Sequence, residues 1–182
     1  MPPGSLVIDG GANVGRVTSV FVRQGFEVHA FEPDPAAYAV LNSRFGAHPR
    51  VHLHQAALGV AAGRLTLHRT REFARRGVKA TTSSSLFPRD LHAGDNAVEV
   101  EVVNLAAFIG SLGRRLDLLK LDVEGSEVDI VERLIADGSY RQIGAIYAET
   151  HERHSADLAE RTARLRRAID EEGISNIDLN WR

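Results

Sequence analysis

The amino-acid sequence predicts an α/β fold with a mostly parallel, doubly wound sheet and a small antiparallel insertion. Strand-like and helix-like segments alternate twice within residues 6–46, which is typical of parallel strands joined by right-handed crossovers. Residues 116–123 are almost continuously apolar, as expected for a parallel strand that is covered on both faces. No repeat or linker interrupts the chain, so we predict a single domain over residues 1–182.

The first half of the chain contains three predicted strands and two predicted helices. The apolar run Leu6–Ile8 ends in a glycine-rich turn, and Val14, Val17 and Phe21 then recur at helical spacing. Proline and glycine mark the limits of the elements that follow. These are a strand over residues 26–32 stopped by Pro33, a helix from Pro35 to Gly46, a strand over residues 51–54 and its exit loop over residues 55–59.

The middle of the chain leaves the parallel pattern. Residues 63–68 and the alternating Val/Glu run 98–103 are predicted to form the two arms of a small antiparallel excursion. Between them, residues 69–79 are basic and residues 81–86 are rich in hydroxyl groups, and a loop of this length inside a domain is often a functional lid. The basic run would either contact an anionic acceptor or form a solvated face.

The last third of the chain returns to alternating strands and helices. The predicted elements are the core strand 116–123, a helix over residues 128–135 closed by Gly138, a strand over residues 143–148, a helix from the N-cap Ser155 to Gly173 and a final strand over residues 174–179. In open parallel sheets, ligands bind outside the carboxyl ends of the strands. Acidic residues lie at four of these ends, namely Asp9, Glu32, Asp122 and Glu149. We therefore expect the functional site at this edge of the sheet.

The turn after the first strand has the pattern Asp-x-Gly-x-Asn-x-Gly, formed by Asp9, Gly11, Asn13 and Gly15. A dinucleotide-binding fingerprint would place glycines where this chain has Asn13 and Arg16. The glycine replaced by Asn13 is the one that lets the backbone approach a pyrophosphate, so the pattern favours a ligand without phosphates. It resembles the first motif of class I methyltransferases, which hold S-adenosylmethionine. The alternative is a tight turn that binds no ligand.

Glu32 ends the second predicted strand and is a candidate ligand of a ribose. The two oxygens of an ionised carboxylate accept hydrogen bonds, so they can bind both hydroxyls of one ribose. This role suits S-adenosylmethionine and NAD alike. The alternative is a solvated glutamate on the surface.

Six segments of the chain, taken in order, resemble the FkbM-type methyltransferases. They are Val7–Gly15, Ala30–Pro35, Gln55–Gly59, Ser84–Leu86, Leu119–Glu127 and the strand end at Glu149. The resemblance implies a Rossmann-like class I methyltransferase fold, S-adenosylmethionine as the methyl donor, and O-methylation of a hydroxyl on a sugar or small natural-product-like metabolite. Members of the family usually carry an additional N-terminal segment, and class I sheets usually close with an antiparallel hairpin. We expect this chain to lack both.

The resemblance also implies a set of donor-binding residues. The exit loop with Ala57 and Leu58 would border the adenine, and Asp122 would stand beside the transferred methyl group. The full predicted cofactor-binding set is Asp9, Gly11, Ala12, Asn13, Gly15, Glu32, Pro33, Ala57, Leu58 and Asp122.

Methyl transfer to a hydroxyl requires a group that takes the proton of the acceptor. The predicted catalytic residues are Asp122, Glu124 and His151, with Glu149 as a further candidate base. Strand alternation would place Lys120, Asp122 and Glu124 on one face. The unperturbed pKa of histidine, near 6.5, suits His151 as a base at neutral pH. Lys120 either belongs to this group or forms a structural ion pair.

The same acids, together with His151, could also hold a divalent cation. Carboxylates with one imidazole suit magnesium or manganese better than a structural zinc. Nothing in the spacing of these residues requires an ion, so a metal is the alternative and not the prediction.

Composition and charge limit the other functions. A formal net charge of -2, and a basic run with Phe73 as its one aromatic residue, give no support for nucleic-acid binding. The chain has no cysteine, which excludes disulfides and thiol chemistry. No segment resembles a signal peptide or approaches the roughly 20 apolar residues of a membrane span, so we predict a cytoplasmic protein that does not bind membranes.

The expected partner is therefore a small hydroxylated acceptor, and the sequence leaves the oligomeric state open. Two other functions compete with methyl transfer. An NAD-dependent oxidoreductase is disfavoured by Asn13 and Arg16. A non-catalytic interaction module with the same fold is the second alternative.

Overall fold

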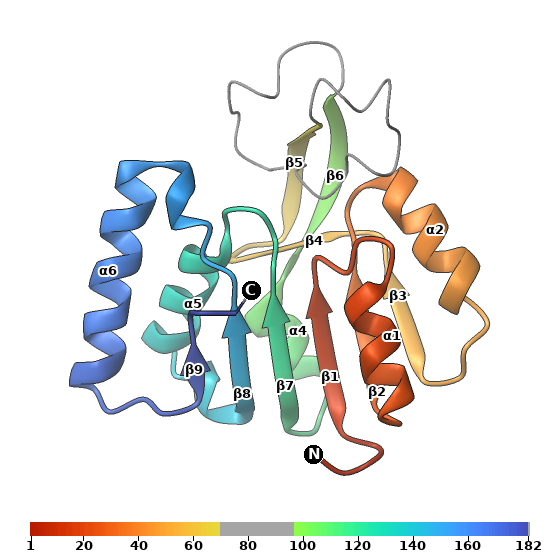
Figure 1. The fold of residues 1–182 in the computed structure, drawn as a ribbon, viewed down its shortest axis with the longest axis horizontal. Helices are drawn as coiled ribbons and strands as arrows, with labels where there is room; N and C mark the ends of the chain where they lie inside the picture. Colours follow the sequence, from red (N-terminus) through yellow and green to blue (C-terminus); the bar gives the residue numbers. More distant parts are fainter. Residues whose placement is uncertain (70–96, 182) are drawn as a thin grey trace.

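The computed structural model describes residues 1–69 and 97–181 of the chain. Within these residues, the main sheet has six parallel strands in the order β3-β2-β1-β7-β8-β9 (Figure 1). Their bounds are β1 (Leu6–Gly10), β2 (Glu27–Phe31), β3 (Val51–His54), β7 (Leu116–Leu121), β8 (Ile143–Ala148) and β9 (Ile177–Asp178). The predicted parallel α/β architecture is confirmed. The Ser84–Leu86 segment, the predicted lid and the basic run after Arg69 lie outside the described residues.

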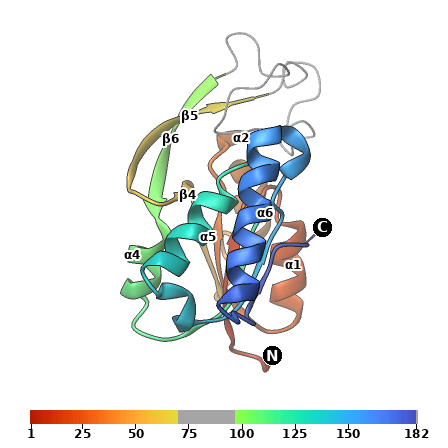
Figure 2. The ribbon, with the colours of Figure 1, turned by 90° about the vertical axis from the view of Figure 1, so that its left-hand side faces the viewer.

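Helices cover both faces of the main sheet (Figures 1 and 2). Their bounds are α1 (Arg16–Arg23), α2 (Pro35–Phe45), α4 (Leu105–Ser111), α5 (Glu127–Ala136) and α6 (Ala156–Glu171), with the short 3-10 segments η2 (Ser139–Gln142) and η3 (Glu152–His154). Neighbouring residues of a strand point to opposite faces, so Val7 packs in the core under α1 and α2, whereas Ile8 packs in the core under α4, α5 and α6. No helix in the described part of the chain is both long and apolar enough to cross a membrane.

The starts of α2 and α6, at Pro35 and after Ser155, are those that the sequence predicts. Pro35 begins α2, and the carboxylate of Asp34 accepts a hydrogen bond of 2.8 Å from the backbone N–H of Ala36. Ser155 caps α6 by accepting a hydrogen bond of 3.1 Å from the backbone N–H of Leu158. These bonds satisfy N–H groups that have no partner within the first turn of a helix.

A second, three-stranded sheet packs beside the main one. Its strands are β4 (Ala57–Gly59), β5 (Gly63–His68) and β6 (Ala97–Asn104), in the order β4-β6-β5. The antiparallel pairing of β5 with β6 confirms the predicted excursion. The prediction of an exit loop over residues 55–59 is wrong for its last three residues, which form β4 parallel to β6. A partner strand more than forty residues away made this run a strand, and its local sequence does not show that partner.

The structure corrects one further prediction and adds one helix. The strand predicted over residues 116–123 ends at Leu121, because Glu124 has a φ of 61° and Gly125 a φ of 127°, which turn the chain away from the sheet. Helix α4 was not predicted. It begins where Asn104 accepts a hydrogen bond of 3.0 Å from the backbone N–H of Ala107.

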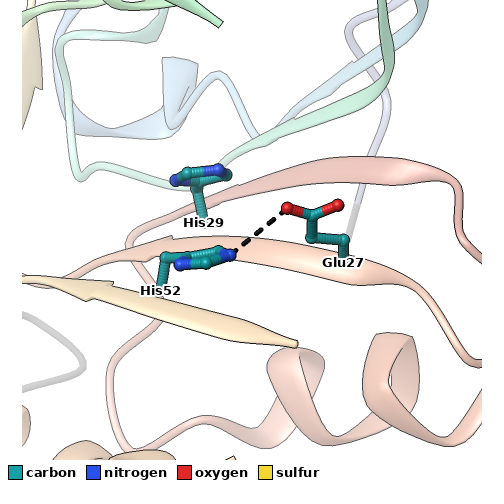
Figure 3. Close-up of side chains that lie close together, drawn as sticks. All are labelled: Glu27, His29 and His52. Atoms are coloured by element: carbon teal, nitrogen blue, oxygen red, sulfur yellow. Dashed lines mark hydrogen bonds and ion pairs between the residues drawn. The ribbon is translucent and has the colours of Figure 1, made fainter. Parts of the chain in front are cut away.

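The outer edge of the sheet at β2 and β3 carries histidines in register. His29 of β2 lies directly opposite His52 of β3. Their rings stack with centroids 4.6 Å apart and planes 22° apart, and Glu27 lies on the same face, two residues before His29 (Figure 3). This cluster is far along β2 from the carboxyl end of the strand at Glu32.

Candidate active site

The loop between β1 and α1 is shaped by three residues in the left-handed region of backbone space. Gly11 has a φ of 72°, Asn13 a φ of 49° and Gly15 a φ of 79°. Asparagine is one of the few residues other than glycine that adopts this conformation readily, which explains Asn13 at a position where dinucleotide-binding loops have glycine. A Cβ atom on Gly11 would lie 1.8 Å from the carbonyl oxygen of Asp122, so the loop packs directly on the segment after β7.

The backbone N–H groups of this loop donate hydrogen bonds to acceptors within the protein. Those of Gly11 and Ala12 donate to the carbonyl of Phe31, and that of Asn13 donates to Glu32. Val14 and Gly15 also donate within the loop. A hydrogen bond from one of these amides to a bound ligand would therefore replace one of these internal bonds.

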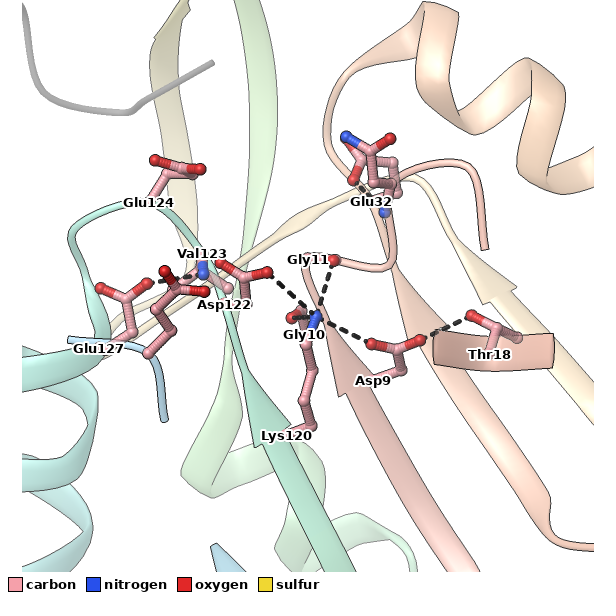
Figure 4. Close-up of polar contacts among 12 residues, drawn as sticks. Asp9, Gly10, Gly11, Thr18, Glu32, Lys120, Asp122, Val123, Glu124 and Glu127 are labelled. Carbon is pink, nitrogen blue, oxygen red and sulfur yellow. Dashed lines mark hydrogen bonds and ion pairs between the residues drawn. The ribbon is translucent and has the colours of Figure 1, made fainter. Parts of the chain in front are cut away.

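A buried ion pair lies beneath the loop (Figure 4). The ammonium of Lys120 is 3.1 Å from the carboxylate of Asp9, and both side chains are buried. Thr18 donates a hydrogen bond of 2.6 Å to the other oxygen of Asp9. These contacts hold the buried Asp9 under the loop, and its predicted contact with the cofactor stays a prediction. Lys120 forms the predicted structural ion pair and also lies 3.8 Å from the carboxylate of Asp122, so both interpretations of Lys120 apply.

Glu32 connects the same loop to the turn after β2. Its two oxygens accept hydrogen bonds of 2.8 Å from the backbone N–H groups of Asn13 and Asp34. Glu32 is 5% exposed, so the alternative of a solvated surface residue is wrong. Burial raises the pKa of its carboxyl to about 7, although both N–H bonds act in the opposite direction. Each oxygen keeps a free lone pair, which a hydroxyl group could use.

The residue after Pro33 has a role that sequence reasoning missed. Asp34 not only caps α2 but also binds Arg69 through both of its oxygens, at 2.7 and 2.9 Å. Such a bidentate pair is geometrically specific. It ties the end of β5 to the start of α2, next to Glu32.

Four carboxylates surround His151 after the ends of β7 and β8. Asp122, Glu124 and Glu149 approach its Nε2 atom to 3.6, 3.5 and 3.7 Å, and Glu127 approaches its Nδ1 atom to 3.2 Å. The prediction that strand alternation places Asp122 and Glu124 on one face is wrong, because β7 ends at Leu121, before both residues. The turn at Glu124 and Gly125 instead brings these side chains together.

Glu127 is the member of this cluster that the sequence analysis did not single out. It is fully buried at the start of α5 and accepts hydrogen bonds from the backbone N–H groups of Val123 (2.7 Å) and Gly125 (2.9 Å). An acid in the first turn of a helix after a glycine was its only signal in the sequence. The side chain folds back over the turn and fixes it.

The charge state of His151 differs from the prediction. Burial alone would lower the pKa of its imidazole, but the hydrogen bond and charge of Glu127, with the charges of Glu124 and Asp122, raise it to about 9. The ring is therefore protonated at neutral pH, which disagrees with its predicted role as a base. Burial raises the pKa of Asp122, the neighbouring charge of Lys120 lowers it, and the charge of Glu149 raises it further.

The cluster has the composition of a divalent-cation site. Asp122, Glu127 and His151 each offer one ligand atom, and these atoms lie within 4.8 Å of one another. An open hollow of about 410 Å³ adjoins the cluster, lined by polar side chains that include Glu149 and Arg166, and by Trp181. The structure therefore combines a carboxylate cluster with space for a polar molecule at the predicted edge of the sheet.

A comparison with protein families identifies the family of this chain. Residues 9–174 match the model of the methyltransferase FkbM domain. The chain belongs to this family. The match extends from Asp9 beyond the end of α6, so it includes Glu32, Asp122 and His151 but not Trp181.

Three curated relatives of this FkbM domain are similar at low identity. "Methyltransferase 1" of Beauveria bassiana is 28% identical over 73% of this chain and 59% of the relative. The 31-O-demethyl-FK506 methyltransferase FkbM of Streptomyces tacrolimicus is 29% identical over 90% of this chain and 72% of the relative. The 2-O-methyltransferase NoeI of Sinorhizobium fredii is 26% identical over 71% of this chain and 57% of the relative. The chain thus spans between about half and three quarters of the length of these relatives.

The remaining predicted donor contacts of this FkbM domain lie close to the loop. Ala57 and Leu58 are buried in β4, and the side chain of Leu58 points into the core toward Gly10, where a Cβ atom would lie 2.8 Å from it. Pro33 is partly buried between Glu32 and Asp34. That these residues border an adenine stays a prediction.

Proposed function

We propose that this chain is an S-adenosylmethionine-dependent O-methyltransferase that acts on a hydroxyl of a small polar acceptor. The observation that carries the proposal is the bond between buried Glu32 and the backbone of Asn13, since it joins a ribose-binding carboxylate to the glycine-rich loop. The family supports methyl transfer. The names of two relatives, a 31-O-demethyl-FK506 methyltransferase and a 2-O-methyltransferase, support oxygen as the accepting atom.

Glu32 and the loop bind and orient the donor in this proposal. The free lone pairs of Glu32 accept the two ribose hydroxyls, while Gly11 allows the loop to stay close to the end of β7 and Gly15 allows it to pack against α2. S-adenosylmethionine, when bound, supplies a methyl group already activated by its sulfonium. The protein therefore contributes mainly alignment of the two reactants and exclusion of water.

Asp122 is the residue that we assign to the acceptor proton. It lies against Gly11, its side chain is 33% exposed, and it is the most exposed carboxylate around His151. As the new carbon–oxygen bond forms and the carbon–sulfur bond breaks, the hydroxyl proton passes to the carboxylate of Asp122. Protonated His151 acts as a positioning residue that holds Asp122 and Glu124 in place. Glu124 remains a second candidate for the proton.

A divalent cation bound by Asp122, Glu127 and His151 is the second way to activate the hydroxyl. Such an ion would polarise the oxygen of the acceptor. The two mechanisms differ in their dependence on metal. An activity that is unchanged after treatment with a chelator supports Asp122 alone, and an activity that is lost and restored by magnesium or manganese supports the ion.

Calorimetric titration tests the proposed donor. We expect S-adenosylhomocysteine to bind the full chain with a stoichiometry of one and NAD not to bind. Binding of NAD without S-adenosylhomocysteine would contradict the proposal and favour the oxidoreductase. If S-adenosylhomocysteine binds but mass spectrometry shows no methylated product across a panel of sugars and polyhydroxylated metabolites, the non-catalytic module is favoured.

A further inference from the structure

The histidine cluster at the outer edge of the main sheet is not used by the proposed active site. Glu27 and His29 lie on β2, and His52 and His54 lie on the edge strand β3. The parallel register places His29 opposite His52 and Phe31 opposite His54, so all these side chains share one face. The cluster begins at the first residue of β2, whereas Glu32 follows the last, so the two sites occupy different parts of the strand.

Figure 3 shows three of these side chains close together on one face of the sheet. One ligand atom from each of Glu27, His29 and His52 lies within 4.8 Å of the others, and His52 Nε2 is 3.3 Å from Glu27 Oε1. Ligand atoms bound to one tetrahedral zinc at about 2.0–2.2 Å lie roughly 3.4 Å from each other. The rings of His29 and His52 are stacked with planes 22° apart, so one ring must rotate before both can bind the same ion, and the side chain of His52 is 47% exposed.

The groups behind the three side chains match those that support metal ligands. His29 Nδ1 is 3.0 Å from His54 Nε2, and if His29 donates in this contact, the lone pair of its Nε2 remains for an ion. Metal-binding imidazoles commonly use their second nitrogen in this way. Arg114 donates to Oε2 of Glu27 at 3.2 Å, which leaves Oε1 toward His52.

His54 is itself held in place by aromatic packing. Its ring stacks on Phe31 with centroids 4.2 Å apart and planes 11° apart, and it meets the ring of Phe108 from α4 at 5.3 Å. A fixed His54 fixes the orientation of His29 through their contact. His29 therefore has limited freedom to rearrange, and the rotation that binding of one ion requires falls on the more exposed His52.

We propose that Glu27, His29 and His52 form a binding site for a transition-metal ion of the zinc type, with His54 and Arg114 as the supporting partners. Two imidazoles and one carboxylate suit zinc, cobalt or nickel better than magnesium or calcium, which prefer oxygen ligands. An ion held there links β2 to β3. The link secures β3, which among residues 1–69 and 97–181 pairs with a neighbour on one side only.

Cobalt titration tests this site on the full chain, prepared without a histidine tag and freed of metal by a chelator. We expect one equivalent of Co²⁺ to give a visible absorption band, to be displaced by Zn²⁺ and to raise the Tm. His52→Asn and Glu27→Gln should each abolish the band. Both positions are partly exposed, so these variants are expected to fold. His54→Gln should weaken binding by about 10- to 100-fold.

Two control variants separate this site from other histidines and from the acidic cluster. His48→Asn lies on the loop before β3 and outside the cluster, so it should leave cobalt binding unchanged. Asp122→Asn should also leave it unchanged. The proposal is overturned if His52→Asn and Glu27→Gln bind cobalt as tightly as the original chain, or if Asp122→Asn alone abolishes binding. Absence of stoichiometric binding would mean that the histidines form only a hydrogen-bonded stack.

Discussion

Lys120 Nζ lies 3.1 Å from Asp9 Oδ1, between two neighbouring strands that carry the two halves of the candidate active site. Both side chains are buried, at 1% and 0% exposure. The same ammonium donates hydrogen bonds of 2.9 Å to the carbonyls of Gly10 and Gly11. One cation therefore neutralises a buried carboxylate and binds two loop carbonyls, which couples the donor loop on β1 to the end of β7.

Lys120→Met should destabilise the protein strongly. Methionine fills most of the volume but leaves Asp9 as an uncompensated buried charge, which costs about 3–5 kcal/mol of unfolding free energy. Urea denaturation measures this difference. Arg164→Met is the control, because Arg164 forms an exposed pair with Glu160 whose loss should cost less than about 1 kcal/mol. Equal effects of the two substitutions would contradict the role of Lys120.

Gly11→Ala should combine two costs. The new Cβ atom would clash with the carbonyl of Asp122, and alanine is strained at a φ of 72°. Together these effects should lower the unfolding free energy by about 2–4 kcal/mol. Gly113→Ala isolates the conformational part, since Gly113 has a φ of 65° and nothing within 4 Å of a Cβ atom. If Gly11→Ala is no worse than Gly113→Ala in urea denaturation, the close approach to Asp122 is not rigid.

The sequence predicts the elements of this fold that have local signals. Apolar runs, Pro35 and Ser155 are such signals, and the structure confirms the elements that they mark. Strand β4 and the pairing of Arg69 with Asp34 depend on partners far away in the chain, and periodicity contains no information on them.

The same distinction applies to the candidate site. The acids Glu32 and Asp122 are visible in the sequence because strand ends are predictable. The protonation of His151 is not, since it depends on four carboxylates that a turn at Glu124 and a folded-back Glu127 bring around the ring. A pKa near that of free histidine is the natural assumption until those distances are known.

Glu32 should make donor binding depend on pH. Its carboxyl has a pKa raised to about 7, and only the ionised form can accept hydrogen bonds from both ribose hydroxyls. The affinity for S-adenosylhomocysteine should therefore be constant well above pH 7 and fall as the pH decreases through 7, by at most about tenfold per pH unit. Calorimetry between pH 5.5 and pH 8.5, chosen as roughly 1.5 units on each side of this pKa, measures the change.

Glu32→Ala should remove that dependence. Loss of the charged hydrogen bonds to the ribose should weaken binding by about 1.5–3 kcal/mol at high pH. Glu99→Gln is a suitable control, because Glu99 forms an exposed pair with Arg64 on β5. An unchanged affinity of Glu32→Ala would remove Glu32 from the donor site.

Asp122→Asn should separate chemistry from donor binding. Asparagine preserves the shape of the side chain but cannot take the acceptor proton, so kcat should fall by about 10²- to 10⁴-fold. The affinity for S-adenosylhomocysteine should change much less, because the backbone contact between Asp122 and Gly11 is kept. A kcat close to that of the original chain would move the proton to Glu124, and Glu124→Gln would then be the decisive variant.

His151→Gln should lower stability in a way that depends on pH. The folded-state pKa of His151, about 9, is above the usual value of 6.5, so the protonated ring stabilises the fold fully below pH 6.5 and loses this effect as the pH rises through 9. The difference in unfolding free energy between the original chain and His151→Gln should be largest near pH 6.5, on the order of 2–3 kcal/mol, and small above pH 9.5. Urea denaturation across this range measures it, and titrating groups that do not interact with His151 cancel in the difference. A difference that stays constant with pH would mean that His151 is neutral among its four carboxylates, and it would restore His151 as a candidate base.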